Sequence, residues 1–438
     1  MSEWAGQSVY VMGLGRFGGG VGVSRYLAGL GARVVVGDRG NPKGLVESIA
    51  QLQDLIDEGG IRIAMGDHAA ADLDGVDVLV VNPAVPKPWE NGFIAEARSR
   101  GIRVTTEIEI VWGLLDHSKV IAVTGSAGKS TTSAMIHHAL REIGCDSVLG
   151  GNIGGSLLTD VDRITDDSVV VLEFSSAMLY WLGASGVIVA SPPRVGCVTN
   201  CVPNHLDWHG SEQHYCDSKR VLSDSAQKLI LGTGVQHWSD DARVVTDDEA
   251  VRGCVVPGKH NGLNAAMATH AVLAMVEDAD REQVLDAVRG YGGLPHRLQL
   301  VHEQDGIRYF NDSKCTVPGA TLLAVDAIGE LVDRSKIHLI AGGYDKGSDL
   351  SSISALGGGI AGLYGIGVTG AGLVEASSGF AKDCGSLGQA MKAIGKRVHD
   401  GDVVLLSPGC ASWDQFANYE ERGDRFAELA RSMRGERV

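Results

Sequence analysis

The 438-residue sequence lacks any apolar run of about 18 residues, the length that a membrane-spanning helix needs. Its first residues, MSEWAGQ, lack the basic and then apolar stretches of a secretory signal peptide. It also lacks a basic surplus, because 54 Asp and Glu outnumber 38 Lys and Arg and the net charge is −16. We therefore expect a cytoplasmic protein with no membrane partner and no nucleic-acid partner, since phosphate backbones are held by clustered cations.

None of the eight cysteines forms a C-x-x-C pair, so the sequence predicts reduced thiols and no zinc site. Glycine is abundant, with 60 residues, near double the usual share of about 7%. Many tight turns between strands and helices would account for this. The chain length predicts two or three domains, and the mean hydropathy of +0.05 is typical of a soluble globular protein.

Short β-branched runs recur along the chain, each followed by Gly or Asn and then by a helical pattern. The runs are SVYVMGLG, ARVVVGD, VDVLVVNPA, KVIAVTG, SVVVLEFSS, VGCVTN, KIHLIAGG and DVVLLSPG. Apolar strands that alternate with helices predict an α/β fold with parallel sheets covered on both faces. Ligands of such sheets bind outside the carboxyl ends of the strands.

Two seams divide the predicted strands into three sets. The first is a predicted helix within TTEIEIVWGLLDHSK, and the second is a Gly/Pro turn in YGGLPHRLQ. We therefore expect domains over residues 1–105, 106–297 and 298–438.

The N-terminal stretch GLGRFG has the spacing G-x-G-x-x-G between a strand and a helix. With Asp38 at the end of the next strand, it matches the dinucleotide fingerprint and favours an NAD-binding enzyme. The glycines alone establish only a tight turn and a helix N-terminus that can face an anion. A purely structural turn is the alternative.

The stretch TGSAGKST resembles a P-loop but is shorter, since Gly125 lies only four residues before Lys129. Gly125 and Gly128 allow backbone amides to curl around phosphate oxygens, and Lys129 can reach the terminal phosphates. Ser130 or Thr131 can offer a hydroxyl to Mg²⁺. The apolar strand before the loop and the helical pattern after it predict a nucleotide site, with chance occurrence as the alternative.

Three further features follow along the chain. Glu173 closes a buried strand, where a carboxylate is costly unless it is paired or bound to a metal such as Mg²⁺; a helix cap or ion pair is the alternative. The loop NHLDWHG, with His205, is a candidate ligand cluster or a hydrogen-bonded loop. Lys219 lies on a predicted helix, and from the residues alone we expect it to be solvated.

The last part of the chain carries polar side chains after several strands. Asn261 and Asn264 share one face of a predicted helix, where they can read a purine edge or where Asn261 can cap the helix. Three loops and the His296-Arg297 pair before them gather polar residues whose cations and hydroxyls suit a ligand that bears a carboxylate. The residues are Arg297, Asp312, Lys314, Thr316, Lys346 and Ser412.

Taken in order, these motifs resemble the Mur ligases over nearly the whole chain. The matching stretches are TGSAGKST, GGNIGGSLL, VLEFSS, NHLDWHG, GKHNGLNAA, HRLQ, NDSK-x-T, GGYDKGSD and SPGCASWDQFANYEERG. The resemblance implies a Rossmann-like N-terminal domain that binds the UDP of a substrate, a central P-loop ATPase-like domain, and a Rossmann-like C-terminal domain. The shortened phosphate loop is the usual form in this family.

The resemblance also implies an activity, and it is strongest to the members that add D-glutamate. It implies an enzyme that uses ATP to join D-glutamate to UDP-N-acetylmuramoyl-L-alanine through an acyl phosphate, in peptidoglycan biosynthesis. We also expect the enzyme to be a monomer. A related Mur-type ligase with another muramoyl or amino-acid substrate is one alternative, and a ligase that adds glutamate to another carboxylate, such as a folate, is a second. An NAD-dependent dehydrogenase and a silent nucleotide-binding regulator are the others.

The resemblance assigns residues to three sites. It implies catalytic roles for Lys129, Glu173, His205 and Lys219, with two Mg²⁺ ions held near Ser130, Glu173, His205 and a carbamylated Lys219. The implied ATP site consists of Gly125, Ser126, Ala127, Gly128, Lys129, Ser130, Thr131, Asn261, Asn264, Arg297 and Asp312. The implied substrate residues are Gly13, Leu14, Gly15, Asp38, Arg39, Asn152, Ser175, Lys314, Thr316, Lys346, Ser412 and Tyr419.

Four positions depart from the family pattern. Ala127 stands where the D-glutamate enzymes usually have Asn, and Met178 replaces a glutamine. Ala84 replaces a common Gly, and Tyr419 replaces a common Phe. Because no charged catalytic group is lost, we expect an active enzyme whose muramoyl specificity is the open question.

Overall fold

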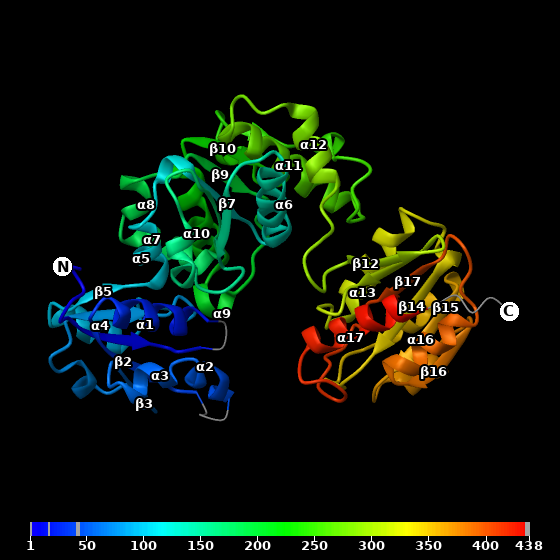
Figure 1. Cartoon of the computed structure of the whole chain (residues 1–438), viewed down its shortest axis with the longest axis horizontal. Coiled ribbons are helices and arrows are strands. Elements are labelled where there is room, and N and C mark those ends of the chain that lie inside the picture. Colours follow the sequence, from blue (N-terminus) through cyan, green and yellow to red (C-terminus); the bar gives the residue numbers. More distant parts are fainter. Residues whose placement is uncertain (1, 16–17, 41–43, 434–438) are drawn as a thin grey trace. The chain divides into compact units, whose positions relative to one another are not determined.

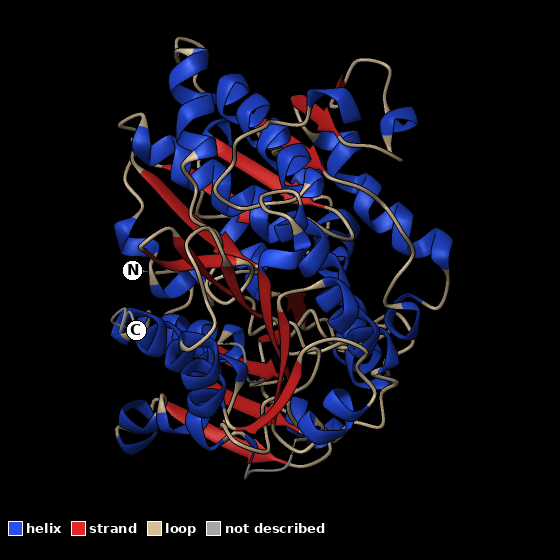
Figure 2. Ribbon diagram, turned by 90° about the vertical axis from the view of Figure 1, so that its right-hand side faces the viewer, coloured by secondary structure: helices blue, strands red, loops and turns tan. Residues whose placement is uncertain are grey.

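The computed structural model describes residues 2–15, 18–40 and 44–433 and contains three sheets, each flanked by helices (Figures 1 and 2). The predicted α/β class is confirmed. Arg16 and Phe17, two positions of the GLGRFG stretch, lie outside the described residues. Within the described ranges, no helix is both long enough and apolar enough to cross a membrane.

The first sheet is parallel and has the strand order β3-β2-β1-β4-β5. Because the strand order reverses between β1 and β4, the glycine loop after β1 lies at a switch point, where ligands bind in open sheets. The strands are β1 Ser8–Met12, β2 Arg33–Asp38, β3 Ile61–Met65, β4 Val78–Val81 and β5 Arg103–Thr105. The helices are α1 Gly19–Gly29, α2 Val46–Ala50, α3 Gln53–Asp57 and α4 Gly92–Ser99.

The second sheet is also parallel, with the order β11-β10-β9-β6-β8-β7. Its central strands β6, β8 and β9 carry the predicted phosphate loop, Glu173 and the 199–204 loop at one edge. The strands are β6 Val120–Thr124, β7 Ser147–Gly151, β8 Val169–Glu173, β9 Val195–Val198, β10 Lys228–Leu231 and β11 Arg243–Val244. The helices are α5 Glu107–Trp112, α6 Lys129–Glu142, α7 Ser176–Ala184, α8 Val187–Ala190, α9 Leu206–His209, α10 Glu212–Ser225, α11 Lys259–Met275 and α12 Arg281–Arg289.

The third sheet has the order β12-β13-β17-β14-β15-β16, in which the first two strands form an antiparallel hairpin and the other pairs are parallel. The strands are β12 Gln299–Gln304, β13 Ile307–Asn311, β14 Ile337–Gly342, β15 Gly362–Ile366, β16 Ala381–Gly385 and β17 Val403–Leu406. The helices are α13 Pro318–Gly329, α14 Ser351–Leu356, α15 Gly370–Glu375, α16 Leu387–Gly395 and α17 Tyr419–Ser432.

The chain forms two compact units, Met1–Glu249 with Ala266–Val288, and Ala250–Ala265 with Arg289–Val438. The second predicted seam lies beside the division at Arg289. The first seam separates two sheets but not two compact units, because buried side chains from both sheets and Trp112 of α5 share one hydrophobic core. The domain limits at residues 105 and 297 remain predictions.

Candidate active site

The phosphate loop connects β6 to α6, as the sequence predicts, and its shape requires glycine at two positions. Gly125 has φ +150°, and a Cβ atom there would lie 1.8 Å from Thr199 Oγ1. Gly128 has φ +84° and caps the N-terminus of α6, which begins at Lys129. The unpaired amides of a helix N-terminus attract anions, so this geometry suits a phosphate group.

Two residues after β9, which sequence analysis did not single out, hold this loop in place. Asn200 Oδ1 accepts hydrogen bonds from the amides of Ser126 (3.1 Å) and Ala127 (3.0 Å), and Asn200 Nδ2 donates to the Ala127 carbonyl (3.1 Å). Thr199 Oγ1 donates to the same carbonyl at 2.6 Å. The position of Thr199 and Asn200 in the sequence could have indicated this role. They follow β9, which is hydrogen-bonded to β6, and both strands end at the same edge of the sheet.

Glu173 ends β8 beside the phosphate loop and is 1% exposed. One oxygen, Oε1, accepts a hydrogen bond from Asn152 Nδ2 at 2.8 Å, whereas Oε2 is buried with no hydrogen-bond partner among the described residues. An ionised carboxylate that is buried and half satisfied is unfavourable unless a cation binds it. The helix cap expected as an alternative does not describe this side chain, because Ser175 caps α7.

Lys219 is buried, with 1% exposure, so the expectation of a solvated lysine is wrong. Its Nζ donates to the carbonyl of Gly125 at 2.8 Å and to Thr124 Oγ1 at 3.3 Å, which places the amine against the phosphate loop. Burial, together with the nearby charge of Lys129, lowers the pKa of Lys219 to about 7. A substantial share of the amine is therefore neutral at neutral pH.

The two histidines of the NHLDWHG loop have different surroundings. His205 is exposed and has φ +51° at the N-cap of α9. His209 is buried, with Nε2 2.8 Å from Ser176 Oγ and Nδ1 2.8 Å from His214 Nδ1, and burial lowers its pKa to about 4. His209 therefore belongs to the packed interior, and His205 is the histidine available to a ligand.

The residues of this sheet edge fit a magnesium ion. Mg²⁺ prefers oxygen ligands and keeps several waters, and the unpaired Glu173 Oε2 and the hydroxyl of Ser130 follow neighbouring strands. In the described part of the chain, no group of three or more His, Cys, Asp or Glu side chains is arranged to hold a metal. A site completed by phosphate oxygens and water is therefore the arrangement that these residues support.

The N-terminal glycine loop is bound by Asp38. Asp38 Oδ2 accepts hydrogen bonds from the amides of Leu14 (2.8 Å) and Gly15 (3.1 Å), and Oδ1 accepts from Gly40 (2.6 Å). Both carboxylate oxygens are thus engaged by the main chain, so a ribose hydroxyl, as in NAD enzymes, would have to compete for them. Arg39 is exposed, and its Nε lies 3.4 Å from Asp67 Oδ1.

Residues in α11 and after β13 form buried polar pairs. Asn261 donates from Nδ2 to the Pro257 carbonyl at 2.6 Å, and Asn264 Nδ2 donates to Asn261 Oδ1 at 3.3 Å. Asn261 lies within the first turn of α11, after Lys259, so it is not the residue that precedes the helix. Asp312 accepts from Ser407 Oγ at 2.8 Å and from the Leu298 amide at 3.2 Å, and burial raises its pKa to about 6.

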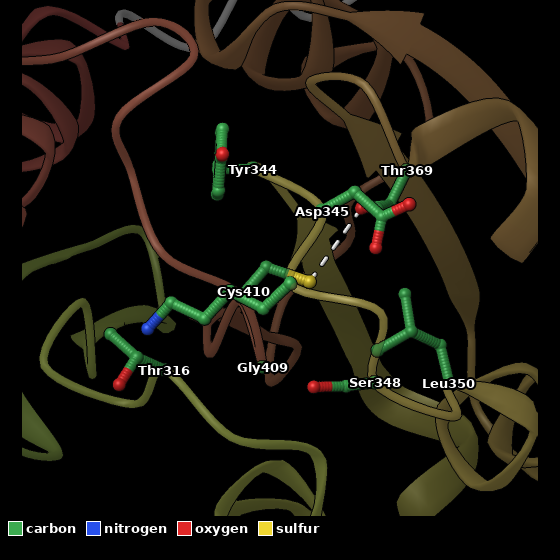
Figure 3. Close-up of a pocket in the computed structure, with 9 residues that line it drawn as sticks. Thr316, Tyr344, Asp345, Ser348, Leu350, Thr369, Gly409 and Cys410 are labelled. Carbon is green, nitrogen blue, oxygen red and sulfur yellow. Dashed lines mark hydrogen bonds between the residues drawn. The ribbon is translucent and has the colours of Figure 1, made fainter.

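A pocket lies at the carboxyl ends of β14 and β17 (Figure 3). Two of its lining residues, Thr316 and Lys346, are predicted substrate residues, and Lys346 Nζ also lies 4.7 Å from the ring centroid of Trp413. Asp345 and Thr369 are lining residues that sequence analysis missed. The complete lining is Thr316, Tyr344, Asp345, Lys346, Ser348, Leu350, Thr369, Gly409 and Cys410.

Three further predicted substrate residues, Lys314, Ser412 and Tyr419, lie near this pocket in the chain but do not line it. Ser412 is buried, and Lys314 Nζ lies 5.5 Å from the ring centroid of Tyr419. Arg297, a predicted ATP-site residue, is exposed. Arg422, which the sequence did not indicate, is fully buried and donates to Ser313 Oγ (2.9 Å), the Ser313 carbonyl (2.8 Å) and the Cys410 carbonyl (3.1 Å).

Parallel sheets, a glycine-rich loop at a helix N-terminus, a buried lysine and a half-satisfied carboxylate define a P-loop-type nucleotide-binding α/β protein. The family model described as the Mur ligase middle domain matches residues 123–233. UDP-N-acetylmuramoylalanine--D-glutamate ligase of Pelotomaculum thermopropionicum is 33% identical, over 99% of both chains. The ligase of the same name from Streptococcus pneumoniae is 31% identical, also over 99% of both chains. The chain belongs to the Mur ligase family.

Solved structures support the fold. UDP-N-acetylmuramate-alanine ligase of Thermotoga maritima has a TM-score of 0.57 and 20% identity, with 98% of this chain and 100% of that chain covered. The MurF ligase of Thermotoga maritima, in complex with ADP, has a TM-score of 0.53 and 15% identity, with 99% of each chain covered. Both support the α/β fold of the sheets described above.

Proposed function

We propose that the chain joins D-glutamate to UDP-N-acetylmuramoyl-L-alanine with ATP as the energy source, as a cytoplasmic step of peptidoglycan biosynthesis. The observation that carries this proposal is the similarity along 99% of the chain to relatives with that name. The phosphate loop, the buried Lys219 and the unpaired oxygen of Glu173 support the ATP-dependent chemistry. The chain acts as a monomer in this proposal.

The central chemical problem is that a carboxylate and a nucleotide phosphate repel each other. When bound, ATP supplies the phosphoryl group that activates the muramoyl carboxylate as an acyl phosphate, and two Mg²⁺ ions reduce the repulsion. The amides of the phosphate loop and Lys129 bind the phosphates. Ser130 and Glu173 would hold one ion, and His205 with Lys219 would support the other.

Lys219 is suited to become a carbamate. Its lowered pKa, about 7, provides the neutral amine that reacts with CO₂, and the reaction converts a cation into an anion. The nearby buried Glu173 acts in the opposite direction, because a negative charge favours the protonated amine. Lys219→Ala should be nearly inactive and partly rescued by a small carboxylic acid, and equal activity of variant and parent would remove this role.

The other predicted residues divide between the two larger ligands. Asp38 and Arg39, with the glycine loop of Gly13, Leu14 and Gly15, would bind the uridine diphosphate part. Asn152, which is bonded to Glu173, and Ser175 would contact the muramoyl part. For ATP, Asn261 and Asn264 would read adenine, Asp312 would bind the ribose, and Arg297 would reach the phosphates.

The pocket in Figure 3 is the proposed D-glutamate site. Lys346 would pair with one carboxylate, while the hydroxyls of Thr316 and Thr369 can donate hydrogen bonds. Asp345 adds a negative charge that complements an amino group. Ser412, Tyr419 and Lys314 would support this site from the adjoining segments.

A phosphate-release assay tests the proposal directly. Release from ATP should require both UDP-N-acetylmuramoyl-L-alanine and D-glutamate, and L-glutamate should give no product. A panel of amino acids with one muramoyl nucleotide distinguishes this activity from that of a related ligase. A clear preference for an amino acid other than D-glutamate would refute the proposed substrate, and saturable NADH fluorescence would refute the assignment of the N-terminal glycine loop.

A further inference from the structure

Two cysteines, one in a loop and one on a helix beside the second sheet, lie side by side near the phosphate loop. Cys201 is in the 199–204 loop after β9, Cys216 is on α10, and their sulfur atoms are 3.1 Å apart. Both side chains are half-buried, so a small oxidant can reach them. The other six cysteines have no sulfur–sulfur contact of this kind among the described residues.

The sequence neighbours of these cysteines meet at one hydroxyl of the phosphate loop. Ser126 Oγ lies 2.8 Å from the hydroxyl of Tyr215, the residue before Cys216. It also accepts a hydrogen bond at 2.8 Å from the amide of Val202, the residue after Cys201. Each cysteine is therefore linked to the phosphate loop by one peptide bond to its neighbour and one hydrogen bond from that neighbour to Ser126.

We propose that Cys201 and Cys216 form a reversible oxidation site, in which hydrogen peroxide converts the two thiols into a disulfide between the 199–204 loop and α10. One sulfur of the pair, as its thiolate, attacks peroxide, forming a sulfenic acid and releasing hydroxide. The other sulfur then attacks the sulfenic sulfur, so that the S–S bond forms, the S–O bond breaks and water leaves. Overall, the two thiols lose two electrons and two protons, and one peroxide becomes two waters; a dithiol reductant reverses the change.

Burial and the adjacent Cys216 raise the pKa of the Cys201 thiol to about 12, so this thiol reacts slowly with an oxidant until it is deprotonated. Free thiols in a reducing compartment form such bonds transiently, in response to an oxidant.

The disulfide has a consequence for activity that depends on the proposed function. A disulfide needs its sulfur atoms about 2.05 Å apart, so the pair must close by about 1 Å. A displacement of about 1 Å in a catalytic arrangement can slow a reaction by roughly 100-fold. Because Tyr215 and Val202 both contact Ser126, we expect oxidation to lower ATP-dependent phosphate release at least about tenfold.

The experiment treats the full chain with hydrogen peroxide, blocks the remaining thiols, and maps peptides by mass spectrometry. We expect a cross-linked peptide pair containing Cys201 and Cys216 that has lost two hydrogens, and recovery of both thiols after addition of dithiothreitol. Peptide mapping requires no enzymatic activity, so it tests the site even if the proposed function fails. Absence of this cross-link, or preferential cross-linking of other cysteines, would overturn the proposal.

Variants separate the cross-link from general oxidative damage. Cys201→Ser and Cys216→Ser should each lose the cross-link and keep their activity after peroxide treatment, while Cys145→Ser should behave as the parent does. Cys201→Ala provides a second test if the serine variant is unstable. Equal inactivation of the parent and Cys216→Ser would overturn the link between this site and the phosphate loop.

Discussion

The buried Lys219 makes the stability of the chain depend on pH in a defined way. The folded chain releases the Lys219 proton near pH 7, whereas the unfolded chain holds it to about 10.5, so the unfolded state binds more protons between these values. Stability therefore rises with pH across this window. Each pKa unit corresponds to about 1.4 kcal/mol, so the charged lysine lowers the free energy of unfolding by about 5 kcal/mol below pH 7.

Lys219→Met removes this charge while keeping a long apolar side chain. Loss of the bond to the Gly125 carbonyl costs the variant about 1 to 3 kcal/mol at every pH, and only the charge effect changes with pH. Relative to the parent, the variant should be most stabilised near pH 6 and should lose about 4 to 5 kcal/mol of that advantage by about pH 10.

Urea unfolding followed by tryptophan fluorescence measures this difference. All of the seven tryptophans except Trp413 belong to the compact unit that contains Lys219, so the signal reports on the relevant part of the chain. Buffers must be free of CO₂ so that no carbamate forms. Lys392→Met, at an exposed helical position, should show no such pH dependence. A constant difference between the parent and Lys219→Met from about pH 6 to about pH 10 would refute the reasoning.

Three substitutions test the site itself. Glu173→Gln should lower kcat for phosphate release at least about 100-fold and raise the Mg²⁺ requirement, while Glu142→Gln, on the exposed end of α6, should match the parent. Asn200→Ala removes the side chain that accepts from the Ser126 and Ala127 amides and is one of two donors to the Ala127 carbonyl, so kcat/KM for ATP should fall about 10- to 100-fold, and an unchanged value would show that the loop holds its own shape. Lys346→Ala should raise the KM for D-glutamate about tenfold or more, with the KM for ATP unchanged. Lys382→Ala, at an exposed position on β16, is the control and should leave both KM values unchanged. A parallel rise in both KM values of Lys346→Ala would place Lys346 outside the amino-acid site.

The sequence predicted the strands that are buried on both faces. All eight β-branched runs became strands, because a continuous apolar segment bounded by glycine has few other stable environments. It did not predict edge strands such as β16 Ala381–Gly385, which is largely exposed and contains Lys382 and Asp383. Such a strand is defined by pairing with β15, a tertiary contact that leaves no periodic pattern in its own residues.

The site residues that follow strands were predictable for the same reason. Carboxyl ends of parallel strands meet at one edge, so Lys129 and Glu173 were expected together. Lys219 was misjudged although a signal existed: Tyr215, Lys219 and Leu222 follow the i, i+4, i+7 spacing of a buried helix face, and all three are buried. The preference of lysine for solvent was given more weight than the position of the residue on α10.

The departures from the family pattern have different physical consequences. Ala127 is exposed, and the loop around it is shaped by backbone bonds to Asn200, so a missing side-chain amide there leaves the loop geometry intact. Met178 is only 9% exposed and joins the hydrophobic core shared by the first two sheets, so a glutamine at this position would need a buried partner. Because the Met178 amide donates to Ser175 Oγ, the change from a polar to an apolar side chain occurs beside a proposed muramoyl contact. Any altered specificity of this chain should therefore concern the muramoyl substrate rather than ATP.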